Sequence, residues 1–279
     1  MVRLKQTTEQ LLTKECFGLN GYFLLKEDTS SVDNSRGIYV AQSLKEKMNM
    51  PIYRYMKYEH LVQLIMEKKL FVSNRQKFTD LREYSEYSFK SMDEIKCTIS
   101  ECPSYKNRKR CKEREERHSQ IWRQPVSCWT FDSHGENMNE NYLMWRSYMG
   151  NGFVCRIGSS IQKIAESIKE LTNDVIISAV EYVPIPRFHI ANTPSDIFKK
   201  PIPYIGEQEI RFVVLHNDIE SCWKNDHLFL SVNPTTLIDE IMLSPFVGYE
   251  EEQIMMKRLL QIMGESSIPI KRSMLLERI

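Results

Sequence analysis

The sequence lacks the features that mark membrane and exported proteins. No stretch approaches the roughly 20 consecutive apolar residues that a membrane-spanning helix needs. The segment from Met1 to Leu12 mixes charged and polar residues and has no apolar centre of the kind found in signal peptides. The seven cysteines are an odd number, which suits reduced thiols better than a disulfide framework. We therefore expect a cytoplasmic protein without a membrane partner.

Excess charge and glycine-rich motifs are also missing. The net charge is +1, with 38 Lys and Arg against 37 Asp and Glu, so there is no global attraction to nucleic acid or to an anionic membrane. No glycine-rich phosphate loop is present, which argues against a Rossmann or P-loop nucleotide site. No internal repeat or low-complexity tract is visible. The 279 residues, 42% of them hydrophobic, are enough for a sizeable core.

The order of patterned segments predicts an α+β fold, with mixed or antiparallel short-stranded sheets and flanking helices. We treat residues 1–50 as an N-terminal extension and residues 51–279 as a single domain with a helical charged insert at about 85–124. Strands are predicted at 52–56, 70–73, 126–131, 152–157, 175–183, 228–232, 238–243 and 268–270. Helices are predicted after residue 57, at about 138–149, from Ser160 onward and at about 249–263.

The strongest sign of a functional site is the strand-like segment from Gly206 to Val214. Side chains alternate across a strand, so Glu207, Glu209 and Arg211 fall on one face and the apolar residues on the other. Two carboxylates and an arginine are costly to bury, and a polar cleft is a natural place for them. The alternative is an exposed strand face crossed by ion pairs to neighbouring strands.

The order of several short blocks resembles the bacterial family called Domain of Unknown Function 2971, over about residues 51–275. The more specific blocks are Met144-Trp145-x-x-Tyr148 and Glu207-x-Glu209-x-Arg211. The supporting blocks are Tyr53-Arg54-Tyr55, Leu70 to Ser73, Phe78 to Glu83, Ser127 to Thr130 and Ile238 to Leu243. The loop at Phe78 lacks the Asn-Asp-Pro that the family usually shows.

Three segments also resemble, in their order, the ADP-ribosyltransferase fold. They carry Arg54, then Ser127 with Thr130, then Glu207 with Glu209. The resemblance implies NAD as a substrate, with Arg54 holding its pyrophosphate or ribose. Ser127 or Thr130 would shape the nicotinamide pocket. Glu209 would accept a hydrogen bond from the ribose 2′-hydroxyl and stabilise an oxocarbenium-like transition state, while Glu207 would orient or deprotonate the acceptor.

Two further cofactor-binding candidates complete the site. Tyr148 and Arg211 are taken as cofactor-binding candidates from the two specific blocks. Ser127 and Thr130 lie on opposite faces of their strand, so at most one points into a given cleft, and we expect Ser127 to do so. Tyr148, like Asn141, lies beside an apolar helical stripe that is typical of core packing and is formed by Met138, Tyr142, Trp145 and Met149.

The charged insert offers two weaker functional signals. Cys97, Cys102, Cys111 and His118 would be the ligands of a zinc ion, but their irregular spacing argues against one. The segment 106–117 is rich in Lys and Arg, interrupted by glutamates at helical spacing. This pattern is typical of a solvated helix, and nucleic-acid contact is the alternative.

The leading hypothesis is an NAD-dependent ADP-ribosyltransferase or NAD glycohydrolase that acts on an unknown macromolecular acceptor. By family analogy, such an activity would suit a toxin or phage-defence effector. The alternatives are a non-enzymatic nucleotide- or peptide-binding module and a nucleic-acid-interacting protein. The ordered set of Arg54, Ser127 and the Glu207–Glu209 pair is the observation that favours the enzyme.

Overall fold

A computed structural model describes residues 21–28, 36–73, 124–131, 140–149, 152–184, 197–216 and 227–275. The strands in these ranges are β1 (Tyr22–Asp28), β2 (Arg36–Ala41), β3 (Ile52–Lys57), β4 (Lys69–Ser73), β5 (Val126–Phe131), β6 (Val154–Ser159), β7 (Asp174–Ala179), β8 (Glu181–Val183), β9 (Lys199–Pro201), β10 (Glu209–Leu215), β11 (His227–Ser231), β12 (Glu240–Leu243) and β13 (Ile270–Arg272). The α-helices are α2 (Tyr58–Glu67), α5 (Tyr142–Met149), α6 (Ile161–Ser167), α8 (Pro234–Leu237) and α9 (Tyr249–Met263), and the 3₁₀ helices are η3 (Gln42–Lys47) and η7 (Ile202–Glu207).

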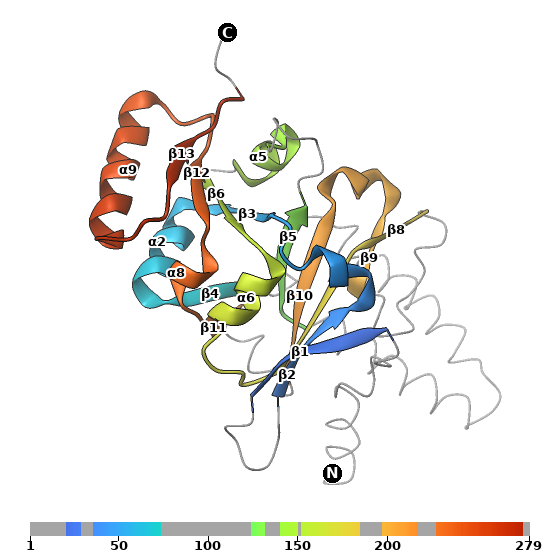
Figure 1. The fold of residues 1–279 in the computed structure, drawn as a ribbon. Coiled ribbons are helices and arrows are strands. Elements are labelled where there is room, and N and C mark those ends of the chain that lie inside the picture. The colour runs from blue at the N-terminus through green and yellow to red at the C-terminus, as the bar shows by residue number, and fades with distance from the viewer. Residues whose placement is uncertain are drawn as a thin grey trace, which may run out of the picture.

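The described strands form one 11-stranded sheet and a separate pair (Figure 1). The order along the large sheet is β1-β2-β7-β10-β5-β3-β6-β12-β13, while β4 pairs with β5 and β11 pairs with β4. Most neighbours are antiparallel, but β2 with β7 and β12 with β13 are parallel. The separate pair, β8 and β9, is also parallel. The predicted α+β class with a mixed sheet is confirmed.

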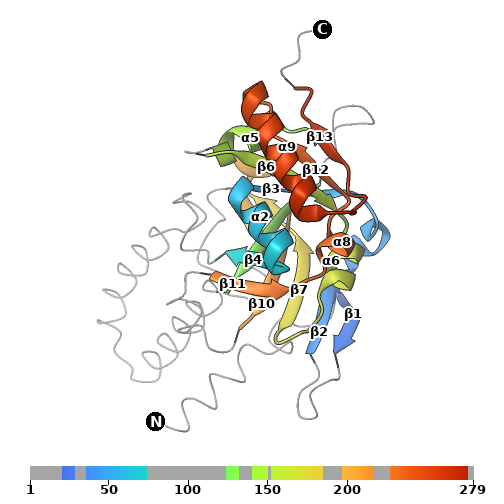
Figure 2. The same ribbon diagram turned by 90° about the vertical axis from the view of Figure 1, so that its left-hand side faces the viewer.

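Both faces of the central strand β10 are buried. Ile210 and Phe212 face the larger core, to which α2, α6 and α9 contribute apolar side chains. Figure 2 shows α2 and α9 side by side against the sheet. On the opposite face, Val213 and Leu215 pack in a smaller cluster that includes Phe198. Any polar side chain on that second face must therefore find its partners inside the protein.

The segment before Pro51 contributes strands to the main sheet. β1 and β2 form an antiparallel pair, and β2 continues the sheet by parallel pairing with β7. Ile38 and Val40 of β2 and Leu44 of η3 are buried in the larger core. These described parts of residues 1–50, treated above as an extension, pack as integral members of the sheet.

Most segments beyond Pro51 follow their sequence patterns. Ser160 caps α6 as predicted, because its hydroxyl oxygen accepts a hydrogen bond from the Lys163 backbone N–H at 3.2 Å. The strand predicted at 175–183 is divided into β7, which pairs with β10, and β8, which pairs with β9. Among the described helices, none is long and apolar enough to cross a membrane.

Candidate functional site

The three strands that carry the predicted site residues are direct neighbours in the sheet. Their order is β10-β5-β3, with β5 paired antiparallel to both of the others. Glu209 lies opposite Thr130, and Thr130 lies opposite Tyr53. Arg54 and Ser127, 73 residues apart in the chain, are therefore brought side by side.

On β3 and β5, Arg54 contacts Ser127 directly. An Nη1 hydrogen of Arg54 is donated to Ser127 Oγ at 2.8 Å, and Trp129 Nε1 donates to the same oxygen at 3.0 Å. The guanidinium also lies 6.0 Å from the Trp129 ring centroid. Ser127 is buried and Arg54 is half-buried. The serine hydroxyl therefore fixes the direction of the arginine side chain.

Arg54 lies where β3 and β5 part. The two strands pair only at Ile52–Phe131 and Tyr53–Thr130. Beyond these pairs β3 stays paired with β6, while the other end of β5 pairs with β4. Figure 1 shows the two strands running in different directions from their junction. Arg54 is the first residue of β3 past this junction, where the backbone of β3 is no longer paired with β5.

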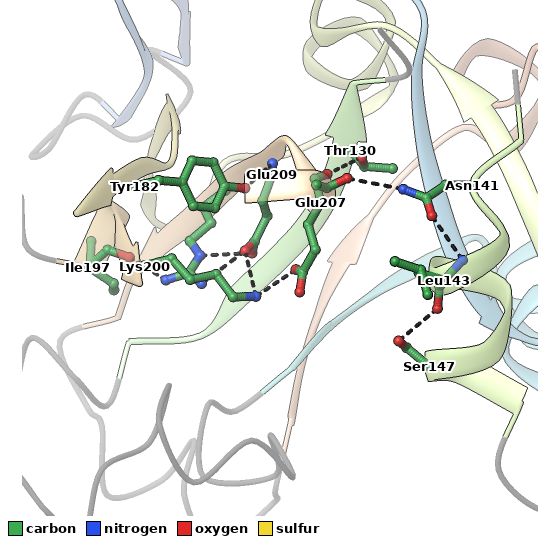
Figure 3. A network of polar contacts seen from close by, with 11 residues as sticks. Thr130, Asn141, Leu143, Ser147, Tyr182, Ile197, Lys200, Glu207 and Glu209 are labelled. Carbon is green, nitrogen blue, oxygen red and sulfur yellow. Dashed lines mark hydrogen bonds and ion pairs between the residues drawn. The ribbon is translucent and has the colours of Figure 1, made fainter. Parts of the chain in front are cut away.

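Glu209 is the centre of a buried ionic network on β10 (Figure 3). Arg211 donates to both of its carboxylate oxygens, from Nε at 2.8 Å and from Nη2 at 3.0 Å. Lys200 Nζ lies 3.4 Å from Glu209 Oε2 and 2.6 Å from Glu207 Oε2. The relative exposure of Glu209 is 5%, so its charge is stabilised by these cations and not by water.

The network keeps Glu209 ionised. Burial by itself would raise the pKa of this carboxyl, but Arg211, Lys200 and a hydrogen bond with Cys128 outweigh burial and lower the pKa to about 2. Tyr182 completes the contacts, because its hydroxyl oxygen accepts a hydrogen bond from the Glu209 backbone N–H at 2.9 Å. An ionised, fixed carboxylate is suited to stabilising positive charge that develops on a ligand.

Glu207 lies outside the strand in which it was predicted. It is the last residue of η7, and Gln208 turns the chain into β10 in the left-handed region, with φ of 44°. The turn is held by Thr130, whose hydroxyl donates to the Glu207 carbonyl, and by the Phe131 N–H, 3.0 Å from the Gln208 carbonyl. The side chain of Glu207 is 30% exposed, so it is the more accessible carboxylate of the pair.

Helix α5 adjoins this turn through Asn141. The Asn141 side-chain amide donates to the Gly206 carbonyl at 3.0 Å (Figure 3). Its amide oxygen accepts from the N–H groups of Leu143 and Met144 at 3.0 and 3.2 Å, which caps the helix. One side chain thus ties the start of α5 to the turn that carries Glu207.

The pKa of Tyr148, on α5, is affected by both Arg54 and Glu209. The residue is 39% exposed, and its ring stacks on that of Tyr55 of β3, with 6.0 Å between centroids. Burial of its hydroxyl raises its pKa above the ordinary value. Glu209 raises this pKa further and Arg54 lowers it, so both charges act on one hydroxyl.

The pleat nevertheless separates Arg54 from Glu209. Glu209, Thr130 and Tyr53 are aligned across the three strands and share one face. Arg54 follows Tyr53 and therefore points to the other face, which Ser127 shares. The side chains of Arg54 and Ser127 therefore lie on the face of the sheet opposite to that of Glu209.

Lys200 and Tyr182 belong to the network but were not predicted from the sequence. Lys200 precedes Pro201 in a proline-rich segment that carries no periodic pattern, so nothing in the sequence placed it against β10. Tyr182 fell in a strand predicted as continuous. The four candidate zinc ligands, the loop 78–83 and the basic segment 106–117 lie outside the described residues. Within the described ranges, no three His, Cys, Asp or Glu side chains are grouped so that they could hold a metal.

Comparisons with known proteins found similar solved structures but no matching sequence or family. No family model matches the sequence, and no curated protein matches it. Among solved structures, the chain is similar to DarT from Thermus sp. 2.9 in complex with NAD+, with a TM-score of 0.36 and 11% identity over 81% of this chain and 96% of DarT. The DarT complexes with carba-NAD+ and with ADP-ribosylated ssDNA give TM-scores of 0.33 and 0.35, at 12% and 11% identity, over 81% of this chain and 96% and 94% of theirs. With scores and identities this low, we draw neither the fold family nor the activity of this chain from the likeness.

Proposed function

We propose that the chain binds NAD at the junction of β3 and β5 and breaks its nicotinamide–ribose bond, passing ADP-ribose to a macromolecular acceptor or to water. The observation that carries the proposal is the adjacency of the strands bearing Arg54, Ser127 and Glu209, whose side chains lie on two faces of the sheet that NAD would reach past the end of the β3–β5 pairing. This adjacency was not required by their order in the sequence. An activity of this kind would suit a toxin or phage-defence effector, as the family resemblance implies.

Each polar group has a defined part in the proposed reaction. Arg54, oriented by Ser127, binds the pyrophosphate through its guanidinium, and Tyr148 lines the ribose side of the site. The bond between ribose C1′ and the nicotinamide nitrogen breaks, and its electron pair leaves with nicotinamide. Glu209 stabilises the positive charge that develops on the ribose. The acceptor oxygen or nitrogen bonds to C1′, and its proton passes to Glu207.

Arg211 acts on Glu209 in this proposal and does not bind the cofactor. Its guanidinium is fully buried, with two hydrogen bonds to the Glu209 carboxylate and one from Nη1 to the Ile197 carbonyl at 2.7 Å. A side chain held in this way orients the carboxylate. This role replaces the cofactor-binding role that the sequence suggested for it.

One observation favours the rival function, a nucleotide-binding module without catalysis. The Glu209 carboxylate is already paired with two cations, and each pairing weakens its ability to stabilise a new positive charge. A structural ion pair of this kind would leave Arg54 and Tyr148 to bind a nucleotide that is not consumed. Binding and turnover must therefore be measured separately.

The test is the incubation of purified protein with NAD, followed by chromatography of released nicotinamide. We expect turnover by the native protein and a fall of about 100-fold or more in Glu209→Gln, the scale on which a lost transition-state contact acts. Glu166→Gln, which changes an exposed carboxylate of α6, is the matched control and should retain full activity. Thermal denaturation verifies that each variant is folded at the assay temperature.

The outcomes separate the two functions. Nicotinamide release that Glu209→Gln abolishes supports the enzyme. NAD binding by calorimetry without release, in the presence and absence of cell extract as a source of acceptor, selects the binding module. Release that is unchanged in folded Glu209→Gln contradicts the assigned role of Glu209. The absence of both binding and release rejects NAD as the ligand.

A further inference from the structure

Lys200 joins the two carboxylates of the Glu207–Glu209 pair. Its Nζ lies 2.6 Å from Glu207 Oε2 and 3.4 Å from Glu209 Oε2, and Figure 3 shows it between the two side chains. The ammonium also lies 4.7 Å from the ring centroid of Tyr204. The side chain is 6% exposed, so the lysine is a buried cation held by carboxylates and by an aromatic ring.

The backbone that carries Lys200 is fixed on two sides. β9 pairs in parallel with β8, and Lys200 lies opposite Tyr182 in that pair. Just before β9, the Ile197 carbonyl accepts a hydrogen bond from Arg211 Nη1 at 2.7 Å. The segment therefore cannot shift along β10 without breaking contacts to Arg211, and the position of the ammonium is set by the fold.

The charges in this network are balanced. Glu207 and Glu209 supply two negative charges, and Lys200 and Arg211 supply two positive charges. Arg211 contacts Glu209, whereas Lys200 reaches both carboxylates. Without Lys200, the two neighbouring carboxylates would lose the cation that contacts both of them, and repulsion between them would favour protonation of one.

We propose that Lys200 is a positioning residue that holds the Glu207 carboxylate beside Glu209 in the charged form that takes the acceptor's proton. This inference rests on the proposed function for the proton transfer. Sequence patterns did not point to Lys200, and its role follows from its contacts alone. A lysine suits the role because a compact ammonium on a flexible stem can bridge two carboxylates at once.

The test compares Lys200→Met and Lys200→Arg with the native protein in the nicotinamide-release assay between pH 5 and 9. We expect Lys200→Met to lower kcat by about 10- to 100-fold, as misplacement of a reacting group does, with little change in KM for NAD. The acidic limb of its kcat profile should move to higher pH by about 1 unit or more. Lys200→Arg keeps the charge and should restore most of the rate.

Lys163→Met is the matched control, because Lys163 is also paired with a carboxylate, that of Asp239, but at an exposed position on α6. It should leave kcat and the pH profile unchanged. A purely structural lysine would alter stability without moving the acidic limb. A folded Lys200→Met with native kcat and an unmoved acidic limb therefore overturns the inference.

A second readout does not depend on turnover. The Glu207 carboxyl carbon, labelled with ¹³C and assigned with Glu207→Gln, is titrated by NMR in native protein and in Lys200→Met. We expect the titration to move up by about 1 to 3 pH units when the ammonium is removed. An unchanged titration rejects the positioning role even if NAD is consumed. Absence of NAD turnover in native protein rejects the proposed function, while the titration still decides whether Lys200 controls the pair.

Discussion

At the scale of single residues, Glu209 makes the stability of the protein depend on acid pH. Its pKa is lowered from 4.5 to about 2 in the folded protein, where Arg211 and Lys200 outweigh the effect of burial. A carboxyl with a lowered folded pKa stabilises the protein fully above its unfolded pKa and loses that contribution as the pH falls toward the folded value. The contribution at neutral pH is about 3 kcal/mol.

Glu209→Gln should therefore be less stable than the native protein by about 3 kcal/mol at pH 7, and by less as the pH falls below about 4.5. Urea denaturation between pH 7 and pH 3 measures the difference. The exposed Glu166→Gln variant gives the baseline. A difference that stays constant down to pH 3 would show that the charge of Glu209 does not contribute through its buried ion pairs.

At the scale of elements, the end of α2 carries conformational strain. Lys68 adopts the left-handed conformation there, with φ of 57°, where a glycine is normally preferred because other residues bring Cβ close to the backbone. Its side chain is exposed. The helix therefore ends at this residue at an energetic cost of about 1 kcal/mol.

We expect Lys68→Gly to raise the free energy of unfolding by about 1 kcal/mol, less the extra backbone entropy that glycine loses on folding. Thermal denaturation should show a higher Tm. Lys169→Gly is the control, because Lys169 is exposed and is not among the described non-glycine residues with positive φ. That variant should be destabilised. Equal losses of stability in both would contradict the argument from the left-handed conformation.

The elements also show how far sequence patterns reach. Val126–Phe131 and Tyr249–Met263 form the predicted strand and helix with the predicted bounds, because local alternation and helical periodicity determine them. In α5, the stripe predicted as core is divided: Trp145 is buried but Tyr142 is exposed, since only part of the helix packs against β3 and β6. Helical periodicity identifies which face of a helix is apolar, but not how much of that face the rest of the protein covers.

The candidate site was predictable only in part, for a similar reason. The alternation of side chains along the predicted strand placed Glu209 and Arg211 on one face, and in the structure two hydrogen bonds join them. The register between two strands cannot be read from the sequence of either strand alone. It could therefore not be predicted that Arg54 lies on the face opposite to Glu209. Lys200 reaches the site through the pairing of β8 with β9, which is a property of the tertiary structure.

At the scale of the whole molecule, the sheet makes the segment before residue 51 part of the same folding unit as the candidate site. β2 lies beside β7, and β7 lies beside β10, so two strand pairings separate the N-terminal hairpin from Glu209. The side chain of Ile38 is fully buried between these elements and the helices of the larger core. A substitution that destabilises β2 should therefore lower the stability of the whole sheet.

Ile38→Ala should lower the free energy of unfolding of the whole domain by about 2 to 5 kcal/mol, because it leaves a cavity in the common core. Urea denaturation followed by tryptophan fluorescence tests this, since the buried Trp129 and Trp145 both lie beyond residue 51. Leu24→Ala, at a side chain that is 46% exposed on β1, is the control and should cost far less. If residues 1–50 were an independent extension, Ile38→Ala would leave the tryptophan transition where it is. A shift of that single transition instead joins the hairpin and the Glu209 network in one cooperative unit.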